Sequence, residues 1–322
     1  MSTNFYPLIF EPILQDRIWG GKKLKSELNK NIHSETTGES WEISTVKDNV
    51  SIISNGIFAN QSLTELINQF PDEILGQKVY QKFGKQFPLL FKYLDAREDL
   101  SIQVHPNDAL AKKRHNSFGK TEMWYILQAD PGAKIIVGFK EKSNVTEYLQ
   151  NLENKSLVDI LKQVEVKKGD VFFIETGTVH AIGAGVVIAE IQQTSDITYR
   201  IYDWDRKDAD QNARELHTDL ALDAINFESF DAKKHYNIHE NTSNEMVNCP
   251  FFITNFINLN GQMNFSEKRD CFKVFMCTEG SFDLQLHTEV YTFSKGQTIL
   301  IPAVLADFRI IGAATILEIY IS

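Results

Sequence analysis

The stretch Gly-Asp-Val-Phe-Phe-Ile-Glu-Thr-Gly-Thr-Val-His, residues 169–180, decides the fold of this chain. A Gly-Asp turn leads into a short apolar run rich in β-forming residues, and a second turn at Thr-Gly-Thr precedes a histidine. The pattern predicts a buried strand that ends near Glu175. The turn after it places His180 at a defined point beside that strand.

A second stretch repeats the first at an offset of 127 residues. Lys168–Glu175 aligns with Lys295–Pro302, and each segment is a Lys-Gly turn that leads into an apolar strand. At the same offset, Asp307 corresponds to His180. The repeat predicts two related β-barrel domains, of which only the first keeps the histidine. Chance similarity between two hairpins is the alternative interpretation.

Short β-type runs dominate the rest of the chain, and their lengths and flanking turn residues predict a mainly β protein. The expected strands are Leu8–Phe10, Trp41–Ser44, Leu89–Asp95, Ser101–Val104, Glu122–Gln128, Lys134–Phe139, Asp170–Glu175, Val186–Gln192, Phe251–Leu259, Phe272–Cys277 and Phe282–Leu286. The expected helices are Ser62–Phe70, Asn107–Arg114, Asn144–Leu152, Ser156–Gln163 and part of Ala209–Ala224. The polar stretch Asp231–Asn248 predicts a linker, so we expect domains at residues 1–235 and 236–322.

Composition narrows the classes of function. The chain has 322 residues, 43% of them hydrophobic and 24% charged, which is typical of a globular protein. Its net charge of −10 argues against nucleic-acid binding, which needs a basic surface. Three cysteines fit free thiols in a reducing compartment. No apolar run reaches the length of about 18 residues that a membrane helix requires. We therefore expect a cytoplasmic, non-membrane protein.

Four residues form a candidate metal site with nitrogen and oxygen ligands. Gln103 and His105 are two positions apart, so they share one face of a strand. Glu122 begins the next strand, and His180 follows the Thr-Gly-Thr turn. This ligand set suits Zn²⁺, with Fe²⁺, Mn²⁺ or Co²⁺ as competitors. Glutamine is an unusual ligand, and a buried histidine that only makes hydrogen bonds is the alternative for either imidazole.

The spacing of residues 169–180 resembles the second motif of the cupin superfamily, although Glu175 stands where that motif usually has proline. The first cupin motif normally has a His-x-His pair with an acidic ligand a few residues later. Here Gln103 takes the place of the first histidine. A predicted helix separates Glu122 from His105.

Four motifs, in this order, strongly resemble type I mannose-6-phosphate isomerase (phosphomannose isomerase), and most closely its short bacterial form. They are Gln-Val-His-Pro-Asn (103–107), Gly-Lys-Thr-Glu-Met-Trp (119–124), Gly-Thr-Val-His-Ala (177–181) and Thr-Tyr-Arg-Ile-Tyr-Asp-Trp-Asp-Arg (198–206). Gln-Asp-Arg-Ile-Trp-Gly-Gly (15–21) and Trp-Glu-Ile-Ser (41–44) agree as well. The resemblance is close over about residues 5–210 and extends to the C-terminal part only in architecture.

The resemblance implies two cupin-like jelly-roll barrels, with helical insertions in the first and no metal ligands in the second. It implies one zinc per chain, held by the quartet of Gln103, His105, Glu122 and His180. The implied reaction is the reversible interconversion of mannose 6-phosphate and fructose 6-phosphate through a zinc-stabilised enediolate. The partner is then a small sugar phosphate, and we expect a monomer or a weak homo-oligomer.

Four further residues are candidates for the active site, and the resemblance implies the roles of three of them. Arg200 matches an active-site arginine that can hold a phosphate or the enediolate oxygen; the alternative is an ion pair with Asp203 or Asp205. Lys120, two residues before Glu122, is from its position a candidate general acid/base or phosphate contact, and a nearby metal and arginine should lower its pKa; the alternative is an exposed turn lysine. Ser101 and Lys92 match positions associated with phosphate binding. The sequence does not identify the general base.

The sequence is compatible with two other functions. One is another cupin metalloenzyme, such as an iron oxygenase or a different sugar-phosphate isomerase. The other is a non-catalytic sugar-binding cupin. The remaining histidines lie in polar or loop-like contexts, and we expect them to be solvated: His33, His115, His217, His235, His239 and His287.

Overall fold

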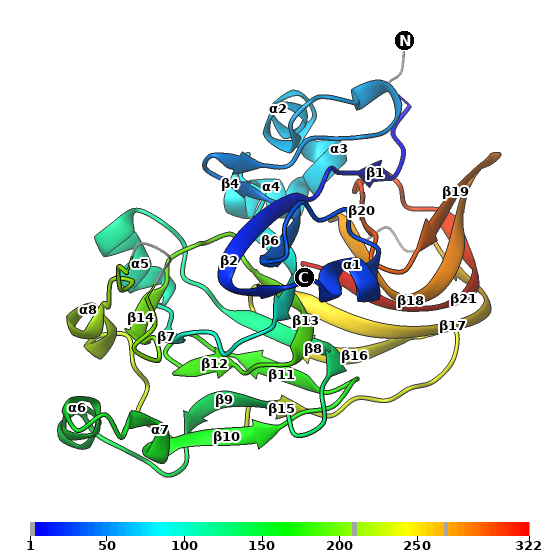
Figure 1. The fold of residues 1–322 in the computed structure, drawn as a ribbon. Helices are drawn as coiled ribbons and strands as arrows, with labels where there is room; N and C mark the ends of the chain where they lie inside the picture. The colour runs from blue at the N-terminus through cyan, green and yellow to red at the C-terminus, as the bar shows by residue number, and fades with distance from the viewer. Residues whose placement is uncertain (1–3, 208–210, 267–269, 322) are drawn as a thin grey trace.

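The computed structural model describes residues 4–207, 211–266 and 270–321. Two antiparallel sheets face each other in the larger part of the molecule (Figure 1). The seven-stranded sheet has the order β15 (Lys233–Lys234), β11 (Val171–Ile174), β8 (Glu122–Ala129), β13 (Val186–Gln193), β6 (Leu89–Ala96), β3 (Thr37–Ile43) and β2 (Ile13–Gly21). The five-stranded sheet has the order β10 (Leu161–Glu165), β9 (Lys134–Phe139), β12 (His180–Ile182), β7 (Ile102–Val104) and β14 (Tyr199–Tyr202).

Both faces of the seven-stranded sheet are covered, which explains why β6 and β13 are buried along their whole length. On β8, Trp124 and Ile126 point into the core between the two facing sheets. Met123 and Tyr125, which alternate with them along the strand, point into a second core behind the sheet. This alternation follows from the two-residue repeat of a strand. It decides which side chains can reach the space between the sheets.

A third sheet, which also has seven strands, lies behind the sheet that contains β8 and β13 and includes most of the C-terminal part of the chain. The name 'seven-stranded sheet' refers to the sheet that contains β8 and β13. Its order is β1 (Leu8–Ile9), β20 (Thr298–Ile301), β18 (Lys273–Leu286), β21 (Phe308–Tyr320), β17 (Ile253–Phe265) and β16 (Ser243–Asn248), with β19 (Glu289–Ser294) paired to β18. The long strands enclose a core of their own. Because β1 pairs with β20, the N-terminal segment joins the C-terminal sheet.

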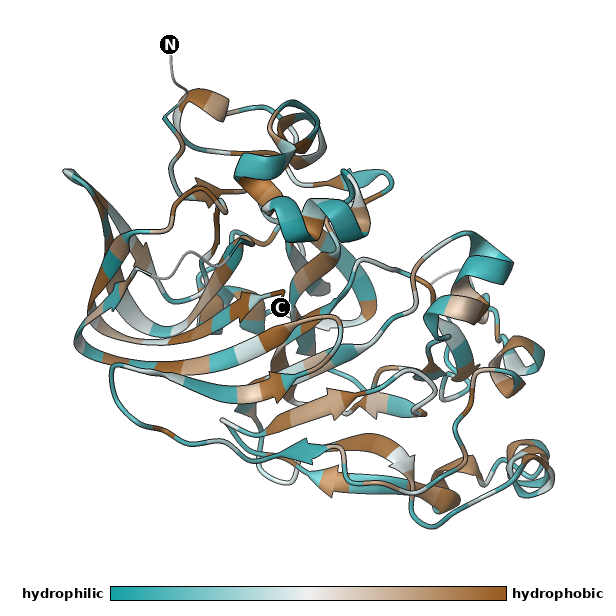
Figure 2. Ribbon diagram, turned by 180° about the vertical axis from the view of Figure 1, so that it is seen from behind, coloured by the Kyte–Doolittle hydropathy of each residue, from teal (hydrophilic) through white to brown (hydrophobic). Residues whose placement is uncertain are grey.

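Helices cover the outer surfaces. They are α1 (Lys23–Leu28), α2 (Leu63–Gln69), α3 (Pro71–Leu75), α4 (Gln77–Phe83), α5 (Asp108–His115), α6 (Val145–Glu153), α7 (Leu157–Ile160) and α8 (Thr218–Leu222). Smaller elements are the 3₁₀ turn η1 (Gly56–Phe58) and the strands β4 (Thr45–Val46) and β5 (Asn49–Val50). Residues of α6, α7 and α8 pack on the outer face of the five-stranded sheet. Figure 2 shows hydrophobic residues along the interior strands, whereas the peripheral helices also carry hydrophilic residues. Among these helices, none has both the length and the apolar character needed to cross a bilayer.

The prediction of a mainly β protein is confirmed, since 44% of residues are in strands and 17% in helices. The capping box of α2 is present, because Ser62 and Glu65 bond to each other's backbone N–H groups. The three cysteines are free and buried.

Several expected element boundaries are wrong. The expected helix Ser156–Gln163 ends at Ile160, and the chain then enters β10 because Leu161 begins a pairing with β9. The two strands expected between 272 and 286 form one strand, β18, which continues through a bulge after Cys277. The expected linker 231–248 contains β15 and β16, and buries Met246 and Val247. Of the expected helix 209–224, only α8 forms; residues 209 and 210 lie outside the described part.

A buried ion pair in the C-terminal sheet gives a first prediction. Lys273 Nζ lies 2.7 Å from Glu318 Oε1, and Glu318 also accepts hydrogen bonds from Ser243 and Asn255. Lys273→Met leaves the buried carboxylate without its cation, so the free energy of unfolding should fall by about 3–5 kcal/mol. Urea denaturation measures the change, with exposed Lys47→Met as the control. Equal stability of the two variants would contradict the prediction.

Candidate metal centre and active-site cleft

Strand β7 places two of the four expected ligands on one side. Ile102 and Val104 pack into the outer core beneath the helices. By alternation, Gln103 and His105 face the space between the two sheets. In the strand register, Gln103 lies opposite His180 of β12 and opposite Arg200 of β14. Three side chains named from separate motifs therefore come from neighbouring positions of one sheet.

The turn before His180 is fixed by its glycine. Gly177 has φ +88°, which favours glycine, and a Cβ there would approach the Ala224 carbonyl oxygen to 2.8 Å. The Gly177 N–H donates to the carbonyl oxygen of His105 at 3.0 Å. This hydrogen bond joins the two histidine-bearing segments, so the turn positions both imidazoles together.

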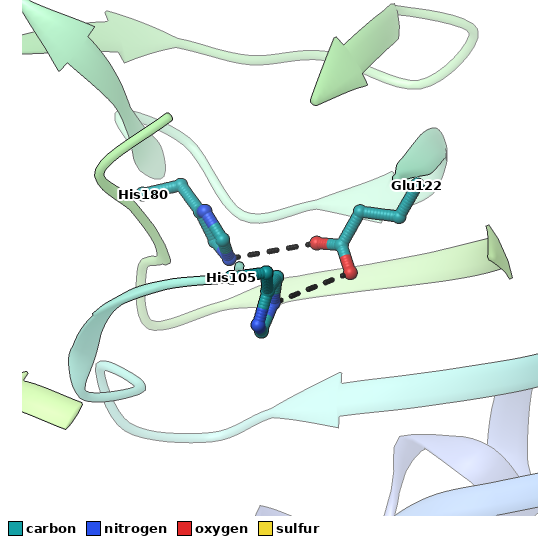
Figure 3. Close-up of side chains that lie close together, drawn as sticks. All are labelled: His105, Glu122 and His180. Carbon is teal, nitrogen blue, oxygen red and sulfur yellow. Dashed lines mark ion pairs between the residues drawn. The ribbon is translucent and has the colours of Figure 1, made fainter. Parts of the chain in front are cut away.

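His105, Glu122 and His180 converge in a buried cluster (Figure 3). His105 Nε2 lies 3.5 Å from Glu122 Oε2, and His180 Nε2 lies 3.5 Å from Glu122 Oε1. All three residues are at most 1% exposed. One donor atom from each residue lies within 4.8 Å of the others. The cluster brings two imidazoles and a carboxylate together in the interior.

The hydrogen bonds of the two imidazoles prepare them as ligands. The Nδ1 atom of His105 lies 2.9 Å from the Ile197 carbonyl oxygen, and that of His180 lies 2.8 Å from the Thr178 carbonyl oxygen. A carbonyl only accepts, so both Nδ1 atoms carry the proton and both Nε2 lone pairs face Glu122. Burial lowers the pKa of His180 to about 4 and lowers that of His105 well below its usual value. Both rings are therefore neutral, as metal ligation requires.

Three donor atoms of this cluster make no hydrogen bond within the described part of the chain. His105 Nε2 and both carboxylate oxygens of Glu122 are buried without one. Glu122 Oε2 has the Lys120 ammonium 3.3 Å away, but His105 Nε2 and Glu122 Oε1 have no such neighbour. Orphaned buried polar atoms are rare and costly, so this pair around one point indicates a missing partner. Neutral nitrogen and carboxylate oxygen donors fit a divalent transition metal. The residues present therefore fit the expected metal.

Gln103 is placed beside this cluster. Its Nε2 atom lies 3.2 Å from His180 Nε2. Amide nitrogen and oxygen exchange places by rotation about the last side-chain bond, and that rotation brings Oε1 to the same point. Gln103 is thus within reach of a fourth ligand position. Its role as a ligand stays a prediction.

The facing sheet carries a row of buried charges beside the metal cluster. Glu190 of β13 lies opposite Lys92 of β6, and their charged atoms are 3.2 Å apart. Glu190 also accepts a hydrogen bond from Trp124 Nε1 at 3.0 Å. Lys120, just before β8, places Nζ 3.3 Å from Glu122 Oε2. Two lysines and two glutamates therefore alternate in sign along the wall of the site.

The protein groups around Lys120 shift its pKa in the direction opposite to the expectation, which rested on a nearby metal ion and arginine. Burial alone would lower it, but the carboxylates of Glu122 and Glu190 outweigh burial, and the pKa is raised. Burial raises the pKa of Glu122 to about 7 despite the opposing charge of Lys120. Burial acts likewise on Glu190, but Lys92 and Lys120 outweigh it and lower its pKa. Lys120 is therefore protonated and Glu190 ionised at neutral pH.

Arg200 lines a cleft of about 530 Å³ that opens between the sheets. The cleft also contains the other residues named from the sequence that lie outside the metal cluster, namely Lys92, Ser101, Gln103 and Lys120. Arg200 does not form the alternative ion pair with Asp203 or Asp205. Asp203 binds Arg206 and Arg214, and Asp205 pairs with Lys155.

Sequence reasoning missed several residues of the cleft. Glu190, Glu39, Arg17 and Arg214 all line it. Arg17 pairs with Glu39, whose pKa falls to about 2 because Lys92, Arg17 and a hydrogen bond from Trp41 outweigh burial. The available signal was an acidic residue inside an apolar run, as at Glu190 in Val-Val-Ile-Ala-Glu-Ile.

Two of the six histidines expected to be solvated have a hydrogen-bond partner in the chain, although His115 is exposed as expected. His115 Nε2 lies 2.8 Å from the Tyr199 hydroxyl. His217 Nδ1 accepts the backbone N–H of Arg200 at 3.1 Å. Both were hidden from sequence reasoning, because their partners lie 84 and 17 residues away in the chain.

Known proteins resemble this chain over nearly its full length. Residues 8–130 match the family model for the phosphomannose isomerase type I catalytic domain, and residues 242–321 match the mannose-6-phosphate isomerase cupin domain. A mannose-6-phosphate isomerase of Bacillus subtilis is 36% identical over 98% of both chains. One from Streptococcus mutans is 34% identical over 95% of both.

Solved structures agree. A crystal structure of the mannose 6-phosphate isomerase from Bacillus subtilis superposes with a TM-score of 0.90 at 32% identity, covering 98% of this chain and 99% of that one. A phosphomannose isomerase mutant from Salmonella typhimurium, at 17% identity and a TM-score of 0.80, shares the fold over 98% of this chain and 99% of its own. With full-length relatives above 30% identity, this chain belongs to the type I mannose-6-phosphate isomerase (phosphomannose isomerase) family.

Proposed function

We propose that the protein interconverts mannose 6-phosphate and fructose 6-phosphate, with one zinc ion per chain. The observation that carries the proposal is the buried convergence of His105, Glu122 and His180, in which His105 Nε2 and Glu122 Oε1 have no hydrogen-bond partner among the described residues, beside a cleft lined by lysine and arginine. Four relatives that match over nearly the whole chain are named as mannose-6-phosphate isomerases, one of them as putative and one as probable. Family membership and site geometry thus support the same activity.

His105, Glu122 and His180 would hold the metal, with Gln103 as the fourth ligand. When bound, a divalent metal supplies positive charge that stabilises developing negative charge on the sugar oxygens. Neutral imidazoles with oxygen ligands suit zinc, and two histidines with one carboxylate also suit Fe²⁺, so metal analysis has to separate the two ions.

The isomerisation moves a proton between C2 and C1 of the open-chain sugar. Glu190 is ionised in the cleft wall, so it is a candidate to accept the proton. Lys120 is protonated and lies beside both Glu122 and the cleft, so it is a candidate to donate one. The two groups have opposite protonation states at neutral pH because each stabilises the charge of the other.

The phosphate requires cationic and hydroxyl donors at the cleft. Arg200 offers a planar set of N–H donors, and its Nε has no hydrogen-bond partner among the described residues. Ser101 lines the same cleft and offers a hydroxyl. Lys92 lines it too, although Glu190 already neutralises part of its charge. We assign Arg200 and Ser101 to the phosphate or the neighbouring sugar oxygens, with Lys92 as a weaker contact.

Residues 1–235 form the proposed catalytic unit, and residues 236–322 the second barrel. Asp307 stands in the second barrel where the repeat would place His180. Apolar residues of both parts share one core behind the seven-stranded sheet. The second barrel therefore supports the back of the sheet that carries Glu122 and Glu190.

A coupled assay for fructose 6-phosphate tests the proposal. The purified protein should convert mannose 6-phosphate, a chelator should abolish turnover, and Zn²⁺ should restore it. Metal analysis of protein purified without added metal separates this isomerase from an iron oxygenase. Fully metallated protein that forms no fructose 6-phosphate would overturn the proposal and favour a binding protein.

A further inference from the structure

Strand β14, which carries Arg200, is an edge strand of the five-stranded sheet. β7 pairs with one side of it. The outward N–H and C=O groups of an edge strand need other partners, or the strand is loosely held. The position of the Arg200 backbone therefore depends on what covers this edge.

The segment 215–217 covers it at Arg200. The backbone N–H of His217 donates to the Arg200 carbonyl oxygen at 2.7 Å. The Arg200 N–H donates to His217 Nδ1 at 3.1 Å. The Arg200 Nη1 group donates to the Glu215 carbonyl oxygen at 2.8 Å. Three hydrogen bonds from one short segment thus fix both the backbone and the guanidinium of this arginine.

The imidazole of His217 is committed to this contact. His217 is the residue before α8, but its side chain makes no capping bond to that helix. It is instead turned toward β14, with its ring centroid 6.4 Å from that of Tyr199 and its side chain 25% exposed. His217 Nδ1 accepts the hydrogen bond from the Arg200 backbone N–H. In a continued sheet, a backbone carbonyl of the next strand would accept this hydrogen bond.

The segment itself is anchored to α5. Arg114 Nη1 donates to the Leu220 carbonyl oxygen at 3.0 Å, and Arg114 also pairs with Asp223. These contacts tie α5 to α8 and to the turn that follows it. The part of the chain that carries His217 is therefore held in place independently of Arg200.

We propose that His217 is a positioning residue for Arg200, acting through its Nδ1 acceptor on the edge of β14. The proposal rests on the proposed function, in which Arg200 contacts the sugar phosphate. Misplacement of a contact by about 1 Å can cost about a hundredfold in rate. Loss of the acceptor should therefore lower kcat/KM although His217 itself does not contact the substrate.

Two replacements separate the acceptor from the shape of the ring. His217→Phe keeps a planar ring and removes the acceptor, whereas His217→Asn keeps an acceptor at the δ1 position. His217→Phe should lower kcat/KM for mannose 6-phosphate by about 10–100-fold, and His217→Asn should retain most of it. Phe and Asn variants with equal kcat/KM would overturn the proposal.

A double-variant cycle tests whether His217 acts through Arg200. In an Arg200→Ala background, His217→Phe should cause no further loss, because coupled residues give non-additive effects. Independent, additive losses would overturn the proposal. Thermal denaturation of each variant checks that it is folded.

Amide hydrogen exchange of the peptide that contains Arg200 gives a readout that does not need turnover. Exchange should be faster in His217→Phe than in wild type and close to wild type in His217→Asn. If wild-type protein lacks isomerase activity, the proposed function fails, while the exchange result still decides whether His217 holds β14. Unchanged exchange in His217→Phe would overturn the positioning role itself.

Discussion

His180→Ala should remove metal binding and nearly all isomerase activity while the β-sheet fold remains. The imidazole contributes one of the converging donors, and its Nε2 lies 3.5 Å from Glu122. A catalytic metal contributes several kcal/mol to transition-state stabilisation, so kcat/KM should fall by about 10²–10³-fold or more. The metal content of the purified variant and the coupled assay measure both losses.

The rise in melting temperature on titration with zinc measures metal binding independently of activity. In wild-type protein a metal that binds only the folded state should raise the melting temperature, by the equivalent of about 2.7 kcal/mol at a hundred times its dissociation constant. His180→Ala should lose this rise. His33→Ala, at an exposed histidine, should retain the rise and the activity. A His180→Ala protein that kept zinc and full turnover would show that the cluster is not the metal centre.

The parts of the site that sequence reasoning predicted are those set by local geometry. Gln103 and His105 share a face because strand side chains alternate, and His180 is placed by the turn at Gly177. Glu122 pairs with Gln192 of the neighbouring strand β13, and β8 begins at Glu122 as expected. Short motifs carry this information because each depends on only a few neighbouring residues.

The parts that it missed depend on register between distant strands. Glu190 meets Lys92 only because β13 pairs with β6, and no local pattern fixes that pairing. The raised pKa of Lys120 follows from the same arrangement, since Glu190 adds a second carboxylate to that of Glu122. His217 reaches Arg200 through a loop that folds back on an edge strand. Each of these contacts needs the assembled sheet.

Replacement of Lys120 should have the second large effect, on both stability and turnover. Lys120 Nζ lies 3.3 Å from Glu122 Oε2, and both side chains are buried. Lys120→Gln leaves the carboxylates of Glu122 and Glu190 in the same pocket with one cation fewer. In metal-free protein, the free energy of unfolding should fall by about 3–5 kcal/mol. Turnover should fall by about 10²–10⁴-fold if Lys120 transfers a proton.

The contributions of Lys120 to stability and to proton transfer can be separated, because only proton transfer requires a side chain that releases a proton. Lys120→Arg keeps a positive charge near Glu122 but cannot release a proton at neutral pH. It should therefore recover more of the unfolding free energy than Lys120→Gln, while the rate stays low. Urea denaturation of metal-free protein and the coupled assay on zinc-loaded protein measure the two effects. If Lys120→Arg recovers turnover as well as stability, Lys120 acts through its charge alone, and the proton donor is another group in the cleft.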